Sequence, residues 1–159
     1  MKNVVAGIAA VLLAMCAFAA QAQVPVYGQS VNLEQARKVI AAAQVEAKKN
    51  SWPVAVAVVD NAGLLGAYER MDNTQTGSVQ VAIDKAVSAA MYRRSTKVFQ
   101  DLVAGGGAGM RILGLRGASP VEGGLTLVMD GKIVGGVGVS GVNPDQDGMV
   151  AKAGSDALK

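Results

Sequence analysis

Residues 125–140 read LTLVMDGKIVGGVGVS, and this stretch carries the clearest structural signal in the chain. Two apolar runs, 125–129 and 132–140, flank the dipeptide Asp130-Gly131. An Asp-Gly pair between apolar runs is typical of a tight β-turn, because such turns need residues that tolerate a positive φ angle. The stretch therefore predicts a β-hairpin.

A second hairpin is predicted upstream. Residues 54–59 consist only of Val and Ala, which favours a buried strand, and residues 64–70 follow as its return strand after the turn at 60–63. A lone hairpin is not a stable sheet. We therefore expect the two hairpins to lie edge to edge in one four-stranded antiparallel sheet.

Helical patterns surround the two hairpins. Asn32 and Gln35 predict a capping box for a helix that ends near Asn50, and Asn143-Pro144 predicts the start of a last helix. Further helices are expected over 78–94, with Ser78 as N-cap, and over 97–104, whereas the glycine run 105–109 is expected to be a loop. The order of elements predicts an α+β fold, with the helices packed on an antiparallel sheet built from two hairpins.

The N-terminus has the pattern of a secretory signal peptide. Lys2 precedes an uncharged run, and Ala20-Gln21-Ala22 matches a cleavage site. We expect residues 1–22 to be removed, residues 23–31 to form an extended arm, and residues 32–159 to form a single domain. These expectations place the protein in the periplasm or outside the cell, with no stable membrane insertion after cleavage.

The composition excludes several kinds of chemistry. The chain has no histidine, and its one cysteine, Cys16, lies in the predicted signal peptide. A His-based triad, a His-ligated haem and, in the mature chain, a thiolate nucleophile are therefore excluded. Tyr27, Tyr92 and Met91 remain as candidate haem-iron ligands, because Tyr and Met are known axial ligands. The net charge of +3, which falls to +2 without Lys2, is too small to indicate a nucleic-acid partner.

The string GVGVSG at 136–141 matches a dinucleotide-binding fingerprint, but its context does not. That fingerprint requires a second parallel strand, ending in an acidic residue about 20 residues further on. Too little chain follows Gly141 for this, and the preceding strand belongs to a predicted hairpin. We interpret the glycines as positions of close packing.

Several charged side chains stand out by their positions. Arg70 lies at a strand end, where it could clamp a carboxylate or form a surface ion pair, and Glu122 precedes two glycines at a strand entrance. Lys85 lies among apolar residues of a predicted helix, where it is expected to snorkel to solvent, with a pocket as the alternative. Glu122 and Asp60 are the candidate acids or bases.

The chain resembles the GlcG/HbpS-like family, a small "haem-degrading" domain also found at the C-terminus of some cobalamin adenosyltransferases. The resemblance covers nearly all of residues 33–158 through a series of short motifs in the family's order. These are WPV (52–54), VVD (58–60), ERMD (69–72), AIDKA (82–86), TKVF (96–99), PVEGG (120–124), DGKIVG (130–135), GVSG (138–141) and DQD (145–147).

The resemblance implies a compact, profilin-like α+β fold, symmetric homo-oligomers and, for some secreted members, haem binding, and it leaves catalysis unsettled. Binding through a family histidine cannot be inherited by a chain that has none. The first hypothesis is an exported small-ligand-binding protein, most simply haem-binding without His ligation, and not an enzyme. The second is an enzyme or accessory acting on a small oxygenated carboxylate such as glycolate; the third is a structural partner of another periplasmic protein. Motif membership gives these ligand-binding candidates: Arg70, Lys85, Thr96, Lys97, Glu122, Gly123, Gly124 and Ser140.

Overall fold

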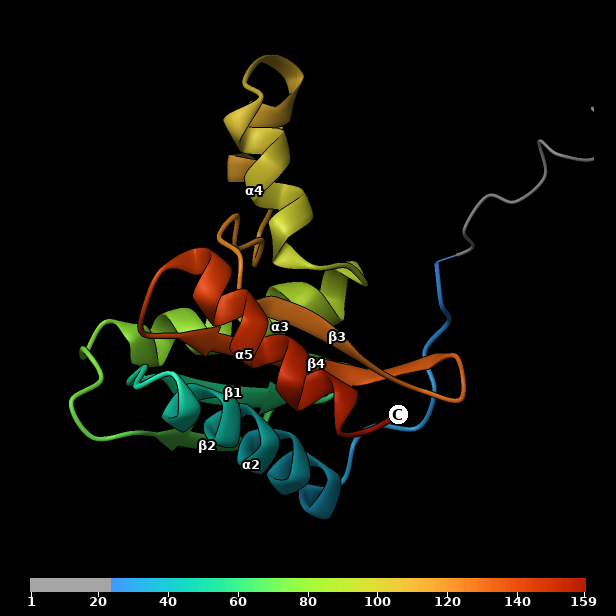
Figure 1. Cartoon of the computed structure of the whole chain (residues 1–159). Helices are drawn as coiled ribbons and strands as arrows, with labels where there is room; N and C mark the ends of the chain where they lie inside the picture. The colour runs from blue at the N-terminus through green and yellow to red at the C-terminus, as the bar shows by residue number, and fades with distance from the viewer. Residues whose placement is uncertain (1–23) are drawn as a thin grey trace, which may run out of the picture.

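A computed structural model describes residues 24–159, so the predicted signal peptide and Cys16 lie outside the described residues. Both hairpins form as predicted, β1 (Ala55–Val59) with β2 (Leu65–Arg70) and β3 (Gly124–Met129) with β4 (Lys132–Ser140). They join through β1 and β4, so the sheet order is β2-β1-β4-β3 and all its neighbours are antiparallel. The predicted α+β fold is confirmed (Figure 1).

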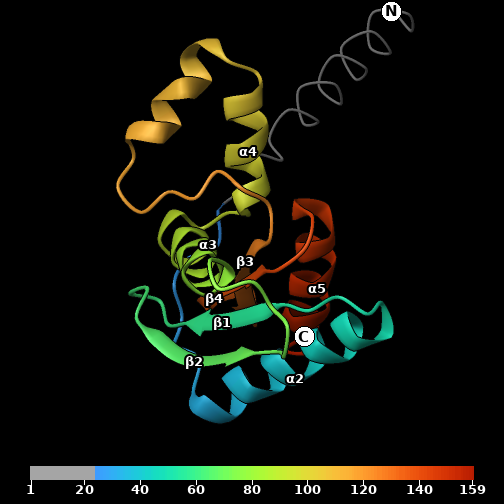
Figure 2. The ribbon, with the colours of Figure 1, turned by 90° about the vertical axis from the view of Figure 1, so that its left-hand side faces the viewer.

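Helices cover both faces of the sheet. The helices α2 (Leu33–Lys49) and α5 (Pro144–Asp156) pack on one face and enclose the larger core, whereas α3 (Ser78–Tyr92) covers the other face (Figure 2). A capping box starts α2 at Asn32, and Asn143 is the N-cap of α5, as the sequence predicts; α5 also has a capping box with Gln146. Because β1 and the inner part of β4 are covered on both faces, both strands are buried almost throughout.

Glycine and alanine hold α3 unusually close to the sheet. A Cβ atom built on Gly138 would lie 2.0 Å from the carbonyl oxygen of Ala82, and one on Gly136 would lie 2.4 Å from that of Ala86. On Gly141 the same atom would meet the Pro53 carbonyl oxygen at 2.2 Å. The three glycines of the string at 136–141 are therefore packing positions, which agrees with the rejection of a dinucleotide fingerprint.

The helix α4 (Thr96–Ala104) and the 3-10 helix η1 (Gly107–Gly114) project from the rest of the molecule as a helical arm (Figures 1 and 2). The expectation of a loop over the whole of 105–109 is wrong, since η1 starts inside it. The reason is a tertiary contact, because a Cβ on Gly109 would lie 1.9 Å from the Leu102 carbonyl oxygen. Only glycine lets η1 approach α4 so closely.

The prediction that Ser78 caps α3 is also wrong. Gly77 occupies the N-cap position, and Ser78 is the first residue of the helix. Its hydroxyl is fully buried and accepts hydrogen bonds from the Gln75 amide and the Ser140 hydroxyl. The hydroxyl that would otherwise cap the helix is therefore bound by Ser140, a buried polar residue of β4. The helix ends at Tyr92 instead of near Arg94, because Arg93 adopts a left-handed conformation with φ of 53°.

The N-terminal arm runs beside the β3–β4 hairpin. Tyr27 forms an isolated parallel bridge with Ile133, and hydrogen bonds join Gly28 and Val26 to the same residue. Within residues 24–159, no helix has both the length and the apolar character needed to cross a bilayer.

The close contact between α3 and β4 gives a stability prediction. We expect Gly138→Val to lower the free energy of unfolding by about 3 kcal/mol or more, because overpacking alone costs 1–3 kcal/mol and here the neighbour is backbone. Urea denaturation followed by circular dichroism measures the change. Gly114→Ala is the matched control, since its Cβ would meet nothing within 4 Å. Equal stability of the Gly138 variant and the wild type would contradict the packing argument.

Candidate functional site

Most of the candidate residues converge at one end of the sheet. The start of β3, the end of β4 and the N-terminal turns of α4 and α5 meet there, and Lys85 enters from α3. The Gly124 N–H donates a 2.9 Å hydrogen bond to Thr96 Oγ1, and the Glu122 N–H donates one of 2.8 Å to Gln100 Oε1. The motif residues gathered at this end are Lys85, Thr96, Lys97, Glu122, Gly123, Gly124 and Ser140.

Lys85 and Asp147 form a buried ion pair at the centre of this cluster. Lys85 Nζ lies 2.8 Å from Asp147 Oδ2 and 2.9 Å from the Val139 carbonyl oxygen, and the two side chains are 1% and 3% exposed. The prediction that Lys85 snorkels to solvent is therefore wrong. Burial lowers the pKa of Lys85 and raises that of Asp147, while the hydrogen bond between them acts in the opposite direction on each.

The ion pair joins the two helical layers. Lys85 belongs to α3 and Asp147 to α5, which pack on opposite faces of the sheet. Gly123, with φ of 125°, leaves room for this contact, because a Cβ there would lie 2.8 Å from Lys85 Nζ and 2.9 Å from the Asp147 Cβ. Asp147 was absent from the sequence candidates, although the DQD motif contains it; no spacing rule links it to a lysine 62 positions earlier.

Glu122 is the half-buried carboxylate of the cluster. A Cβ atom built on Gly148 would lie 2.7 Å from Glu122 Oε1, so the Glu122 side chain packs against the first turns of α5. The hydrogen bond from Lys97 to Asp101 raises the pKa of Lys97, and the charge of Glu122 adds to this effect. Glu122 therefore lies within electrostatic range of an exposed lysine and of the buried Lys85.

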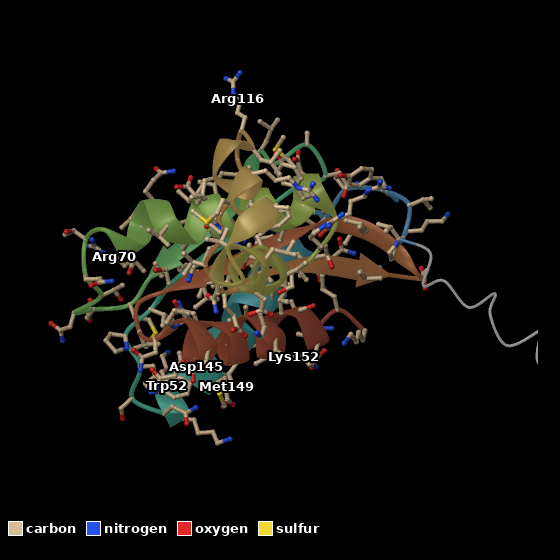
Figure 3. All side chains as sticks on the ribbon, turned by 90° about the horizontal axis from the view of Figure 1, so that it is seen from above. Trp52, Arg70, Arg116, Asp145, Met149 and Lys152 are labelled. Atoms are coloured by element: carbon tan, nitrogen blue, oxygen red, sulfur yellow. The ribbon has the colours of Figure 1, made fainter. Side chains whose placement is uncertain are left out.

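Arg70 and Asp60 stand apart from this cluster. Arg70 on β2 pairs with Ala55 on β1, and Ala55 pairs with Ser140 on β4. The three residues therefore lie level with one another across the sheet, but Arg70 is on the exposed edge strand β2, two strands from β4. Figure 3 shows it well apart from Asp145 and Met149 of α5. Asp60 follows the opposite end of β1, where its Oδ1 accepts hydrogen bonds from the N–H groups of Ala62 and Leu64 and shapes the hairpin turn.

Two of the haem-iron candidates meet at the C-terminal end of α3. The Tyr27 hydroxyl donates to the carbonyl oxygens of Ala90 and Met91 at 2.9 and 3.2 Å, and the Arg93 guanidinium lies 5.6 Å from the Tyr27 ring centroid. Tyr27 is 43% exposed and Met91 is 49% exposed. The Met91 sulfur lies 3.4 Å from the position of a Cβ on Gly63, so it borders the β1–β2 turn, where Leu64 is 67% exposed.

We call Tyr27, Leu64, Met91 and Arg93 the α3-end patch. Sequence reasoning missed Arg93, because the charge at a helix C-terminus already explained it. Tyr92 lies outside the patch, since its hydroxyl donates to the Arg116 carbonyl oxygen at 2.7 Å and its ring packs edge-on against Phe99.

The cavities are small. One of about 310 Å³ lies between the N-terminal arm and the β3–β4 turn, and one of about 380 Å³ lies between α3 and residues 117–120. Both volumes are near the lower end of the range for ligand pockets. Residues 24–159 contain no group of three or more acidic, His or Cys side chains that could hold a metal ion.

The ion pair gives a second stability prediction. We expect Lys85→Met to cost about 3–5 kcal/mol of unfolding free energy, because it leaves Asp147 buried without a partner. The double variant Lys85→Met/Asp147→Leu should recover most of this loss, since replacing a buried pair with apolar residues is often neutral or stabilising. Urea denaturation of the three proteins measures both effects. Equal losses in the single and double variants would contradict the account.

Comparisons with known proteins identify the family. The family model described as "Haem degrading protein HbpS-like" matches residues 31–156. "Protein GlcG" of Escherichia coli (strain K12) is 41% identical over 107 residues, which cover 67% of this chain and 78% of that protein. An uncharacterized 15.0 kDa protein of Citrobacter freundii is 30% identical over 131 residues, covering 81% and 92% of the two chains.

Solved structures agree with this assignment. HbpS superimposes with a TM-score of 0.76 at 29% identity, covering 89% of this chain and 99% of that one. A structure described as a PduOC–haem complex gives a TM-score of 0.74 at 27% identity, covering 82% and 96%. Family model, relatives and structures converge on one conclusion: the chain belongs to the HbpS-like family.

Proposed function

We propose that the protein binds haem at its surface, at the α3-end patch and without histidine ligation. The observation that carries the proposal is the juxtaposition of a tyrosine, a methionine and an arginine, all exposed at the surface, at one helix end. Membership of the HbpS-like family and the solved PduOC–haem complex support a role in binding haem or a related small ligand.

The residues of the patch match the chemistry of haem. A thioether can serve as an axial iron ligand, which gives Met91 that role. The Tyr27 hydroxyl donates to two backbone carbonyls, and it would have to leave both of them to bind iron as a phenolate. The Arg93 guanidinium can form a charge-assisted hydrogen bond with a propionate carboxylate. Leu64 adds apolar surface for the macrocycle. Thr96 is fully buried and bonded to Gly124, and it does not contribute to this surface.

The position of the patch implies an open site. Neither of the cavities of about 310 and 380 Å³ is lined by a residue of the patch, so haem here would be held on a surface and left partly in contact with solvent. Such a site suits transfer or sensing of haem better than its permanent retention.

The proposal extends to export and to self-association. Export rests on the signal-peptide pattern of residues 1–22, and it gives a periplasmic or secreted protein. Self-association rests on the large apolar side chains that remain exposed on α4 and η1, since a stable monomer rarely leaves such groups clustered.

Haem titration tests the site. Hemin added to residues 23–159 should give a sharp, saturable Soret band, and Met91→Leu should weaken binding about tenfold and move the band, because a sulfur ligand is lost. Met149→Leu is the matched control, since Met149 is 52% exposed on α5.

Tyr27→Phe and Tyr92→Phe form a second matched pair, of which only the first should alter the spectrum. A non-saturating absorbance rise in the wild type, or identical spectra for the Met91 and Met149 variants, would refute haem ligation at the patch.

A second candidate function is binding of a small oxygenated carboxylate near Glu122. The convergence of Lys97, Glu122 and Gly123 beside the first turns of α5 favours it. Lys85 is buried against Asp147, whereas Lys97 is exposed and pairs with Asp101 at the surface, so Lys97 would hold the anion and Glu122 would move a proton.

Thermal shift with glycolate tests this alternative. A ligand at 100 times its Kd stabilises by about 2.7 kcal/mol, which raises Tm by several degrees. The rise should disappear in Lys97→Ala and persist in Lys132→Ala, an exposed lysine on β4. No rise in the wild type at millimolar glycolate would exclude this carboxylate.

A further inference from the structure

A polar cavity lies where the N-terminal arm runs beside the β3–β4 hairpin. It has a volume of about 310 Å³, and its lining comes from the N-terminal arm, the start of α2 and the hairpin. Figure 1 shows the N-terminal arm next to the turn of this hairpin. None of the residues considered above as ligands of haem or glycolate lines this cavity, so it has no role in either proposed function.

Hydrogen bonds on both sides hold one wall of the cavity in place. The Gly28 N–H donates to the Ile133 carbonyl oxygen at 2.8 Å, and the Val31 N–H donates to the Val134 carbonyl oxygen at 2.7 Å. Residues 29–30 lie between these two contacts and line the cavity. The backbone of this wall is therefore fixed before a ligand arrives, which lowers the entropic cost of binding.

Two opposite charges lie at the rim of the cavity without pairing with each other. Asp130 and Lys132 both line the cavity, and both are exposed. No ion pair joins either of them to another charged side chain of residues 24–159. The stem of Lys132 packs on the N-terminal arm, since a Cβ atom built on Gly28 would lie 2.9 Å from Lys132 Cβ and 3.4 Å from its Cδ. Glycine at position 28 thus leaves room for this long side chain at the rim.

The rest of the lining is uncharged. Amide and hydroxyl groups come from three side chains: Gln29, Ser30 and Gln35. Met129 and Val134 supply apolar surface. The capping box already uses two N–H groups at the start of α2, so this helix end does not define the ligand. A ligand that carried a third charge would find no charged partner in the lining.

The size and the charges of the cavity select a class of ligand. Because a water molecule occupies about 30 Å³ of liquid volume, the cavity has room for a molecule of roughly ten non-hydrogen atoms. We propose that it binds a free α-amino acid with an uncharged polar side chain, whose carboxylate pairs with Lys132 and whose ammonium group pairs with Asp130. Charge-assisted hydrogen bonds at both ends fix the orientation of such a zwitterion.

Isothermal titration calorimetry on residues 23–159 tests the site, with L-glutamine as the probe because its size matches the cavity. We expect saturable binding with a Kd of about 0.1–1 mM, as for a small ligand in a half-open site. Glutaramate is glutamine without its ammonium group, and γ-aminobutyramide is glutamine without its carboxylate. Each should bind about tenfold more weakly, since each loses one charge-assisted contact.

Charge-removing variants locate the site. Lys132→Ala and Asp130→Asn should each raise the Kd for L-glutamine about tenfold. Asparagine suits position 130 because it tolerates the left-handed conformation found there, with φ of 49°. Lys38→Ala and Asp72→Asn are the matched controls, since both residues are exposed and neither lines the cavity. They should leave the Kd unchanged.

The same titrations separate this site from the two proposed functions. L-glutamine binding should weaken in Lys132→Ala and persist in Lys97→Ala, whereas the opposite pattern is expected for glycolate, which has no ammonium group for Asp130. Met91→Leu, the variant that tests the haem site, should leave L-glutamine binding unchanged.

Three results would overturn the assignment. Equal affinity for L-glutamine and glutaramate would indicate a simple anion site. Binding that neither Lys132→Ala nor Asp130→Asn weakens would place the amino acid elsewhere on the protein. Failure of L-glutamine, L-asparagine and L-serine alike to bind the wild type at millimolar concentration would refute an amino-acid site altogether.

Discussion

The structure depends on how closely α3 approaches β4. Gly136 and Gly138 place the carbonyl oxygens of Ala86 and Ala82 where a side chain would otherwise be, and the facing residues of β1 and α3 are mostly alanine. This contact brings Lys85 within reach of the far side of the sheet. The buried Lys85–Asp147 ion pair, the glycines at the start of β3 and the packing position of α5 all depend on this short distance between α3 and β4.

A consequence of this tight packing is that little room is left inside the molecule for a ligand. The motif residues converge, but protein atoms already fill the centre of the cluster. Asp147 neutralises Lys85 there, and the backbone of Gly123 and Gly124 occupies the remaining space. The α3-end patch, the rim around Glu122 and the helical arm are among the places where reactive or apolar groups face outward.

Much of the fold could be predicted from the sequence because its signals are local. The Asp130-Gly131 turn, the N-caps at Asn32 and Asn143, and the apolar run of β1 each depend on neighbouring residues. The predictions for individual residues failed where a tertiary contact determines the local structure. Ser78 bonds to Ser140 on β4 and Lys85 reaches Asp147, each across 62 positions of the sequence, and η1 packs back on the Leu102 carbonyl of the preceding helix. For the same reason the gathering of Tyr27, Met91 and Arg93 could not be derived from spacing.

The central pairing of the sheet has a consequence for folding kinetics. Residues 55–59 pair with residues 136–140, so the two middle strands come from opposite ends of the domain, whereas each hairpin is closed by a short turn. Local hairpins form in microseconds, but contacts between distant segments wait for a large loss of chain entropy. We therefore expect the meeting of the two hairpins to be slower than the closure of either one, and until it occurs the inner edges of β1 and β4 stay open to pairing with other chains.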